Sequence, residues 1–153
     1  MSDYRLAYSE EFGALDLVVE DDDLSLDEGL ETADLVSLYC HRRAANEDVV
    51  ADESDRRGWW GDTFAEEPGD QIGSRLWLLE RGLLTPDYGS QAARYAEEAL
   101  AWMVSDGVAE SASAVATTNG ATRSAELLIT ISRPSGDTVE FRFSSLWEST
   151  LAV

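Results

Sequence analysis

Lysine is absent from this sequence of 153 residues, so arginine carries all eleven positive charges. The 31 acidic residues outnumber them and give a net charge of -20. A field this negative repels nucleic acid and anionic membranes, so we exclude DNA, RNA and lipid as direct ligands. It favours solubility or a basic partner. The missing lysine has two open explanations. One is codon bias, and the other is adaptation to a salty cytoplasm, where salt screens the repulsion between like charges.

Cysteine and histidine each occur once, as the neighbours Cys40 and His41. This excludes an internal disulfide framework and a thiolate-rich metal site. The motifs HExxH, GxSxG, GxxxxGK and CxxC do not occur. We expect Cys40 to be a half-buried small apolar group and His41 to lie near a helix end. We therefore predict no catalytic, cofactor-binding or metal-binding residue, and no enzyme.

Long apolar runs are also missing. No stretch of about 18 apolar residues could span a membrane. The first residues, MSDYRLAYSEEF, lack the basic and apolar regions of a secretory signal. We expect a single domain over residues 1–153, with an acidic N-terminal segment 1–28 and a long ordered loop 44–72. Residues 1–34 hold twelve acids and one arginine, a net charge of -11, which leaves -9 for the rest.

Hydrophobic periodicity predicts strands near the start of the chain, followed by a helix. Leu15, Leu17 and Val19 alternate with Asp16, Val18 and Glu20, which is typical of a strand. The acidic run 20–23 then predicts a turn, and a short second strand follows it. Asp27 is a candidate cap for a helix that we expect to run to about Arg43, with Leu30, Asp34 and Leu38 on one face.

The second half of the chain predicts helices and then strands. A short helix is expected within 73–82, with Ser74 as its cap. The clearest helix begins near Thr85 and Pro86 and ends at Gly107. Its apolar stripe includes Ala92, Tyr95, Ala99 and Trp102. Alternating residues then predict a strand within 108–118 and a hairpin in which the strands of Leu127–Ile131 and Val139–Phe143 flank the turn RPSGD.

Together these elements predict an α+β domain. We expect a mixed or antiparallel sheet with two to three helices packed on one face.

The heptad RRGWWGD, residues 56–62, lies in the middle of the irregular segment. Gly58 and Gly61 permit tight or left-handed backbone. Tryptophan and arginine are enriched in interface hot spots, and arginine can pair with Asp62 or with a partner carboxylate. Adjacent side chains point different ways, so one tryptophan can enter the core while the other faces a partner. The alternative that both tryptophans fasten the loop to the core stays open.

Carboxylates near these tryptophans allow a third interpretation. Asp62, Glu66, Glu67 and Asp70 could form an acid pair for glycoside hydrolysis beside stacking aromatic rings. Because the chain has 31 acidic residues, many such pairs can be found, so this pair is weak evidence for an enzyme.

The heptad, followed by GSRLWLLERG and the alanine-rich AARYAEEALAWMVSDGVAE, resembles the small baseplate wedge proteins of Mu-like phage tails. DEGLETADLVSLYCHRRA also fits, so the resemblance covers about residues 12–145. The C-terminal hairpin matches only in its pattern. The group is related to wedge proteins called lysozyme-like, so a peptidoglycan-cleaving tail enzyme is the alternative function.

The resemblance implies a structural subunit of a contractile phage tail or tailocin, in the virion tail baseplate, assembled in the host cytoplasm. It implies that the protein clamps the helical core of a larger wedge protein and contacts or nucleates the first ring of the tail sheath protein. Central spike or hub proteins are further candidate neighbours, and the assembly is multimeric. The family motif includes Gly73 and Leu76 as well. We expect the partner interface to comprise Arg56, Arg57, Gly58, Trp59, Trp60, Gly61, Asp62, Ser74, Arg75, Trp77, Phe141 and Phe143.

Overall fold

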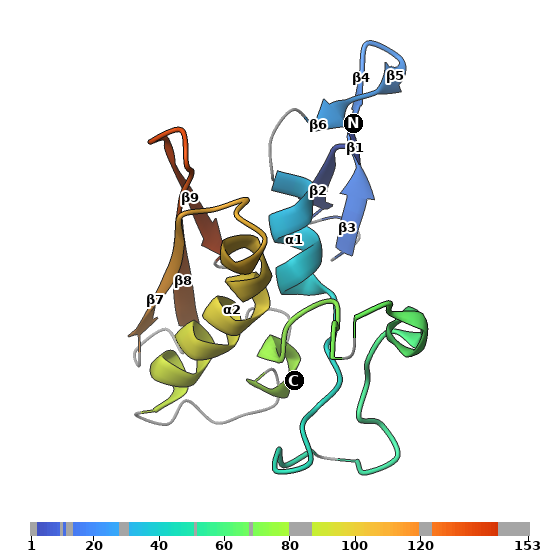
Figure 1. The fold of residues 1–153 in the computed structure, drawn as a ribbon, viewed down its shortest axis with the longest axis vertical. Coiled ribbons are helices and arrows are strands. Elements are labelled where there is room, and N and C mark those ends of the chain that lie inside the picture. The colour runs from blue at the N-terminus through green and yellow to red at the C-terminus, as the bar shows by residue number, and fades with distance from the viewer. Residues whose placement is uncertain are drawn as a thin grey trace.

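The computed structural model describes residues 3–9, 11, 14–27, 31–50, 52–67, 69–79, 87–119 and 124–143. Figure 1 shows a helix-covered sheet on one side, a second helix with small N-terminal strands beside it, and a long segment that loops away below. The described strands all pair antiparallel within their sheets, and the expected α+β class is confirmed.

Helix α2 (Tyr88–Ser105) packs on a three-stranded antiparallel sheet. The sheet has the order β7 (Ser111–Asn119), β8 (Ser124–Ser132), β9 (Thr138–Phe143). The predicted turn at 133–137 joins β8 to β9, because Arg133 N–H bonds to the carbonyl of Asp137. The predicted C-terminal strands are therefore confirmed.

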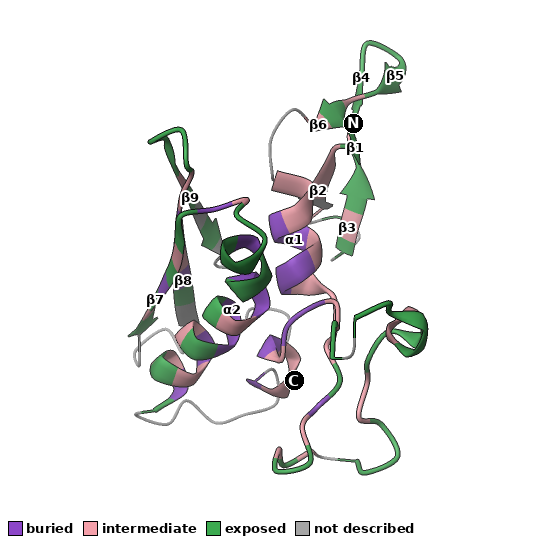
Figure 2. Ribbon diagram, viewed as in Figure 1, coloured by how far each residue is buried: buried purple, intermediate pink, exposed green. Residues whose placement is uncertain are grey.

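The core surrounds α2: it lies between the helix and this sheet and extends to buried residues within 35–38 and 76–79. Figure 2 shows the buried residues of the helix. Gly107 ends α2 at a φ of +73°, with its N–H on the carbonyl of Val104. The N–H of Val108 reaches back to the carbonyl of Met103, which completes a glycine-terminated helix end. Thr85 and Pro86 lie outside the described residues. The predicted stripe of α2 is buried except for Trp102, which is 37% exposed, and Leu100 is buried although the stripe did not include it. On the sheet, the alternating residues of β8 are buried and Val139 of β9 is partly exposed. The buried predicted residues are Ala92, Tyr95, Ala96, Ala99, Met103, Leu127, Ile129 and Ile131.

Described residues between 3 and 27 form three two-stranded antiparallel sheets instead of joining the C-terminal sheet. The predicted turn at 21–22 connects two of these strands, and both of its aspartates adopt a positive φ. The pairs are β1 (Asp3–Tyr4) with β6 (Leu26–Asp27), β2 (Leu6–Ser9) with β3 (Ala14–Leu17), and β4 (Val19–Glu20) with β5 (Asp23–Leu24).

Helix α1 (Glu31–Tyr39) packs against α2 and β2. Asp27 helps to fix its start, because a carboxylate oxygen accepts a hydrogen bond of 2.8 Å from the N–H of Thr32. Asp34 and Leu38 are buried on one face, as the periodicity predicts, whereas Leu30 lies outside the described residues.

The predicted end of this helix at Arg43 is wrong. Helix α1 ends at Tyr39, and His41 instead forms a parallel bridge with Ser74. The basic residues after Tyr39 therefore do not belong to its last turn. A partner 33 positions away in the chain overrides the local preference for helix.

The described residues of the segment 44–72 are irregular, as expected, apart from the short 3₁₀ helix η1 (Trp60–Phe64). A second 3₁₀ helix, η2 (Leu76–Leu79), follows within the stretch where a short helix was predicted. Within the described residues, no helix has the length and apolar character needed to cross a membrane.

Candidate functional site

The two ends of the long segment are fastened together at its base. The N–H of Ser74 bonds to the carbonyl of Cys40 at 2.9 Å, and the N–H of Arg42 bonds to the carbonyl of Ser74 at 2.9 Å. Gly73 has a φ of +91°, and a Cβ there would lie 2.3 Å from the carbonyl oxygen of Cys40. Only glycine permits this approach, so the segment forms a closed loop with a fixed base.

Glycines shape the heptad for two different reasons. Gly58 has a φ of +109°, which a residue with a side chain rarely adopts. Gly61 instead makes room for an aromatic ring, because a Cβ at this position would lie 2.2 Å from the indole of Trp59. The ring of Trp59 therefore lies across Gly61.

Three aromatic residues form a contiguous cluster on this loop. The rings of Trp59 and Trp60 are 5.5 Å apart, and the ring of Phe64 meets Trp60 edge-on at 6.1 Å. Their exposed fractions lie between 49% and 77%. Neither tryptophan is buried, so the expectation that one of them enters the core is wrong, and their exposure does not favour the alternative that both fasten the loop to the core. The loop therefore presents most of this apolar area to solvent.

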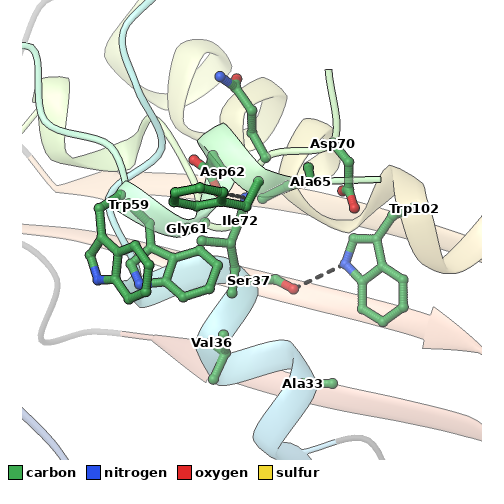
Figure 3. Close-up of a pocket in the computed structure, with 15 residues that line it drawn as sticks. Ala33, Val36, Ser37, Trp59, Gly61, Asp62, Ala65, Asp70, Ile72 and Trp102 are labelled. Carbon is green, nitrogen blue, oxygen red and sulfur yellow. Dashed lines mark hydrogen bonds between the residues drawn. The ribbon is translucent and has the colours of Figure 1, made fainter. Parts of the chain in front are cut away.

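The cluster forms one wall of an apolar groove of about 660 Å³. Helix α1 contributes Ala33, Val36 and Ser37. In Figure 3, Trp59 and Trp102 lie at opposite ends of the groove, with side chains of α1 below them. The chain thus brings together η1, the stretch 70–73 and both α helices.

Hydrogen bonds fix the walls of this groove. The indole N–H of Trp102 donates to Ser37 Oγ at 3.0 Å, which joins α2 to α1. Asp62 Oδ1 accepts from the N–H of Ile72 at 3.2 Å, which joins η1 to the returning chain. Asp62 Oδ2 is buried and has no hydrogen-bond partner among the described residues. The carboxylate proposed for an acid pair thus helps to hold the loop in shape.

The arginines of the heptad contact residues of the same loop and its base. Arg56 forms an ion pair with Glu53 at 2.7 Å. The guanidinium of Arg57 contacts His41 and lies 4.9 Å from the ring centroid of Trp77. The indole of Trp77 in turn donates to the carbonyl of Arg42 at 2.8 Å. The Arg57 side chain and Trp77 therefore brace the base of the loop by a cation–π contact.

Cys40 and His41 support this base and show no sign of activation. Burial and then the charge of Arg57 lower the pKa of His41, so its imidazole is neutral at pH 7. Burial and then Asp62 raise the pKa of the Cys40 thiol. A raised pKa keeps the thiol protonated and unreactive. Cys40 is half-buried, as predicted.

Ser74 and Arg75 are mostly enclosed by their own chain. Ser74 Oγ donates to the carbonyl of Leu38 at 2.6 Å and accepts from the N–H of Leu76 at 3.3 Å, which confirms its predicted capping contact. Arg75 pairs with Asp48 at 2.8 Å and with Glu98, and its side chain is 11% exposed. These two residues thus position the loop on α1 and α2. Their predicted role in a partner interface stays a prediction.

Asp34 is a buried carboxyl beside the groove residues of α1. It is 1% exposed, and neither of its oxygens has a hydrogen-bond partner among the described residues. Burial raises its pKa to about 7, the charge of Arg133 opposes the rise, and Asp27 and Glu31 add to it. The sequence placed Asp34 on the apolar face of its helix, but gave no sign that the carboxyl would be protonated.

The remaining predicted interface residues, Phe141 and Phe143, lie on β9. Their backbones pair with Ile129 and Leu127 of β8, while their side chains lie outside the described residues. Among the described residues, no cluster of three or more histidine, cysteine, aspartate and glutamate side chains could hold a metal ion.

Comparison with known proteins decides the family. The sequence model of the family described as "Phage protein GP46" matches residues 30–138, which include all the groove residues. The chain belongs to this family. "Baseplate protein gp46" of Escherichia phage Mu is 46% identical over 96 residues, which cover 62% of this chain and 64% of the Mu protein.

A second relative matches nearly the whole chain. The "Mu-like prophage FluMu protein gp46" of Haemophilus influenzae is 36% identical over 147 residues, or 96% of this chain and 98% of that protein. The resemblance to Mu-like baseplate proteins, derived from the heptad and the blocks that follow it, is confirmed.

Proposed function

We propose that this protein is a structural subunit of the tail baseplate of a contractile phage or tailocin, located in the virion and assembled in the host cytoplasm. The similarity to the baseplate protein gp46 of phage Mu supports the baseplate assignment. The observation that carries the proposal is the groove, in which a folded chain leaves three aromatic side chains exposed beside an apolar floor. Such a surface is typical of a protein interface.

The occupant of the groove in this proposal is an amphipathic helix from the larger wedge protein of the baseplate. A helix places apolar side chains at positions i, i+3, i+4 and i+7 along one face, which suits an elongated apolar groove. Trp60 and Phe64 would pack against that face from η1, and Val36 would support it from α1. Arg57 and Arg75 act indirectly in this proposal, because they hold the loop that carries the aromatic residues.

A second contact in the proposal uses the C-terminal sheet. Strand β9 pairs with β8 on one side, and no described strand pairs with its other side. An exposed strand edge can accept an extended segment from another chain through backbone hydrogen bonds. The tail sheath protein is the expected donor of such a segment.

Co-expression with the products of the flanking reading frames tests the groove. We expect a stable complex with a larger helical protein, and we expect Trp60→Ser to reduce its recovery at least tenfold, in line with the loss of an interface hot spot of about 1.4 kcal/mol or more. Val49→Ser is the matched control, because Val49 is highly exposed but does not line the groove. If Trp60→Ser is recovered with the larger protein in normal amounts, the groove is not the binding site.

The sheath contact needs its own experiment. We expect removal of residues 144–153, which follow β9 in the sequence, to lower sheath polymerisation on assembled baseplates. Sheath assembly at the normal rate would reject the second contact and leave the first intact.

The alternative function, peptidoglycan cleavage, is tested on the purified chain. We expect no turnover of peptidoglycan. Activity that is lost in Asp62→Asn or Asp70→Asn would replace the structural proposal with an enzymatic one.

A further inference from the structure

The N-terminal strands meet at a three-way junction. Three backbone hydrogen bonds form a closed cycle there: Arg5 N–H to Ser25 O at 2.8 Å, Ser25 N–H to Val18 O at 2.8 Å, and Val18 N–H to Arg5 O at 3.0 Å. Each of these residues lies between two short strands that pair with different partners. The chain therefore changes its pairing partner at all three positions.

Apolar residues flank every corner of this junction. The cross-strand pairs next to it are Leu6 with Leu17, Val19 with Leu24, and Tyr4 with Leu26. Because strand residues two positions apart point to the same face, these six side chains gather on one side of the junction.

Most of this apolar face is open to solvent. Leu6 is partly buried against the core. The other five side chains have exposed fractions between 37% and 63%, and we call this set the junction patch: Tyr4, Leu17, Val19, Leu24 and Leu26.

Acidic residues surround the patch in an unfavourable arrangement. Asp3 lies directly opposite Asp27, and Glu20 lies directly opposite Asp23. Like charges in directly opposed positions destabilise a pair of strands. Residues 1–34 carry a net charge of -11, so the repulsion extends over the whole segment. A cationic surface placed against this region would relieve it.

We propose that the junction patch is a second docking face, which binds a basic protein segment that carries exposed apolar side chains. The apolar pairs supply contact area and the rim of carboxylates selects positive charge. A second copy of this chain would bring another strongly negative segment to the same place. Nucleic acid and anionic membranes are repelled in the same way. The patch lies outside residues 30–138 and does not line the groove, so this proposal does not depend on the groove's occupant.

Photo-crosslinking in the co-expressed complex tests the proposal. The probe is the set of flanking gene products, and a photoreactive amino acid replaces Val19 in the tagged chain. We expect an adduct with a peptide that carries net positive charge and apolar side chains. The matched control replaces Val49, which is exposed but distant in sequence from the patch, and should not yield this adduct. Absence of an adduct, or an adduct with another copy of the chain or with an acidic peptide, would overturn the proposal.

Two variants separate this face from the groove. Leu26→Ser in the same crosslinking background should lower the adduct yield at least fivefold, while circular dichroism shows an unchanged fold. Trp60→Ser should leave the yield unchanged even where it releases the groove's partner. If Trp60→Ser abolished the adduct and Leu26→Ser did not, the crosslink would belong to the groove and the junction proposal would fail.

A defined peptide pair tests the chemistry without a natural partner. A peptide of alternating leucine and arginine should bind the chain at least tenfold more tightly than one of alternating serine and arginine, with an affinity that falls as salt rises. The double variant Val19→Ser, Leu26→Ser should remove the difference. Equal binding of the two peptides to the unaltered chain would show attraction by charge alone and would refute an apolar docking face.

Discussion

Helix α2 buries most of its apolar residues, whereas the loop that carries the heptad RRGWWGD exposes them. Leu100 and Met103 of α2 are fully buried between the helix and its neighbours. Trp60 and Phe64 of η1 are mostly exposed, although they belong to a loop with a fastened base and defined hydrogen bonds. Fold stability therefore depends on the first set much more than on the second. An ordered loop that exposes its largest apolar side chains is what the proposed interface requires.

Leu100→Ala should have the largest effect on stability. The side chain is fully buried, so truncation leaves a cavity and should lower the free energy of unfolding by about 4 kcal/mol. Urea denaturation followed by circular dichroism measures this loss. A loss below about 1 kcal/mol would show that the region around α2 is not the main source of stability.

Asp34→Asn should change the pH dependence of stability. The folded protein holds a proton on Asp34 up to about pH 7, whereas the unfolded chain releases it near the ordinary carboxyl pKa of about 4. The protonated Asp34 thus stabilises the fold at low pH. This contribution falls as the pH rises from about 4 to about 7 and is lost above that range. Relative to Asp34→Asn, the unaltered chain should lose about 3 kcal/mol between pH 4.5 and pH 8. Parallel curves for the two proteins in urea denaturation would contradict a protonated Asp34.

Arg75→Ala should destabilise the attachment of the loop. Its removal leaves the largely buried Asp48 without its cationic partner, at a cost of about 2 kcal/mol. Glu53→Ala breaks the more exposed pair with Arg56 and serves as the control, with a loss below about 0.5 kcal/mol. Thermal unfolding compares the two variants, and equal losses would mean that Arg75 has no special role at the loop base.

Gly61→Ala should have a smaller effect on stability than the changes at Leu100, Asp34 and Arg75, and a clear effect on the aromatic cluster. The added methyl group would displace the ring of Trp59, which is half-exposed, so the expected loss of stability is below about 1 kcal/mol. Tryptophan fluorescence should shift as the ring moves. An unchanged spectrum would show that Trp59 does not lie across Gly61 in solution.

Local patterns predicted the elements that depend on local interactions. Alternation along β8 and the glycine after α2 specify a strand and a helix end through neighbours in sequence, and both predictions hold. The heptad was predicted as an interface from its residue types, and the exposure of Trp60 agrees with that interpretation. Its family was predicted from the same residues and is confirmed.

Contacts between distant residues could not be predicted in this way. Helix α1 stops before Arg43 because His41 pairs with Ser74. Arg75 was predicted as a partner contact from the family motif, and its ion pairs with Asp48 and Glu98 could not be inferred from spacing. The N-terminal strands were predicted, but their exchange of partners around Arg5, and the junction patch that results, depend on three separate segments.

The most direct test of the account measures one variant in two ways. Trp60→Ser is compared with the unaltered chain by urea denaturation and by calorimetric titration with the purified larger wedge protein. We expect a free energy of unfolding within about 1 kcal/mol of the unaltered chain and an affinity at least tenfold weaker. A loss of about 3 kcal/mol in stability with an unchanged affinity would show that the exposed aromatic cluster serves the fold, and would contradict the central claim.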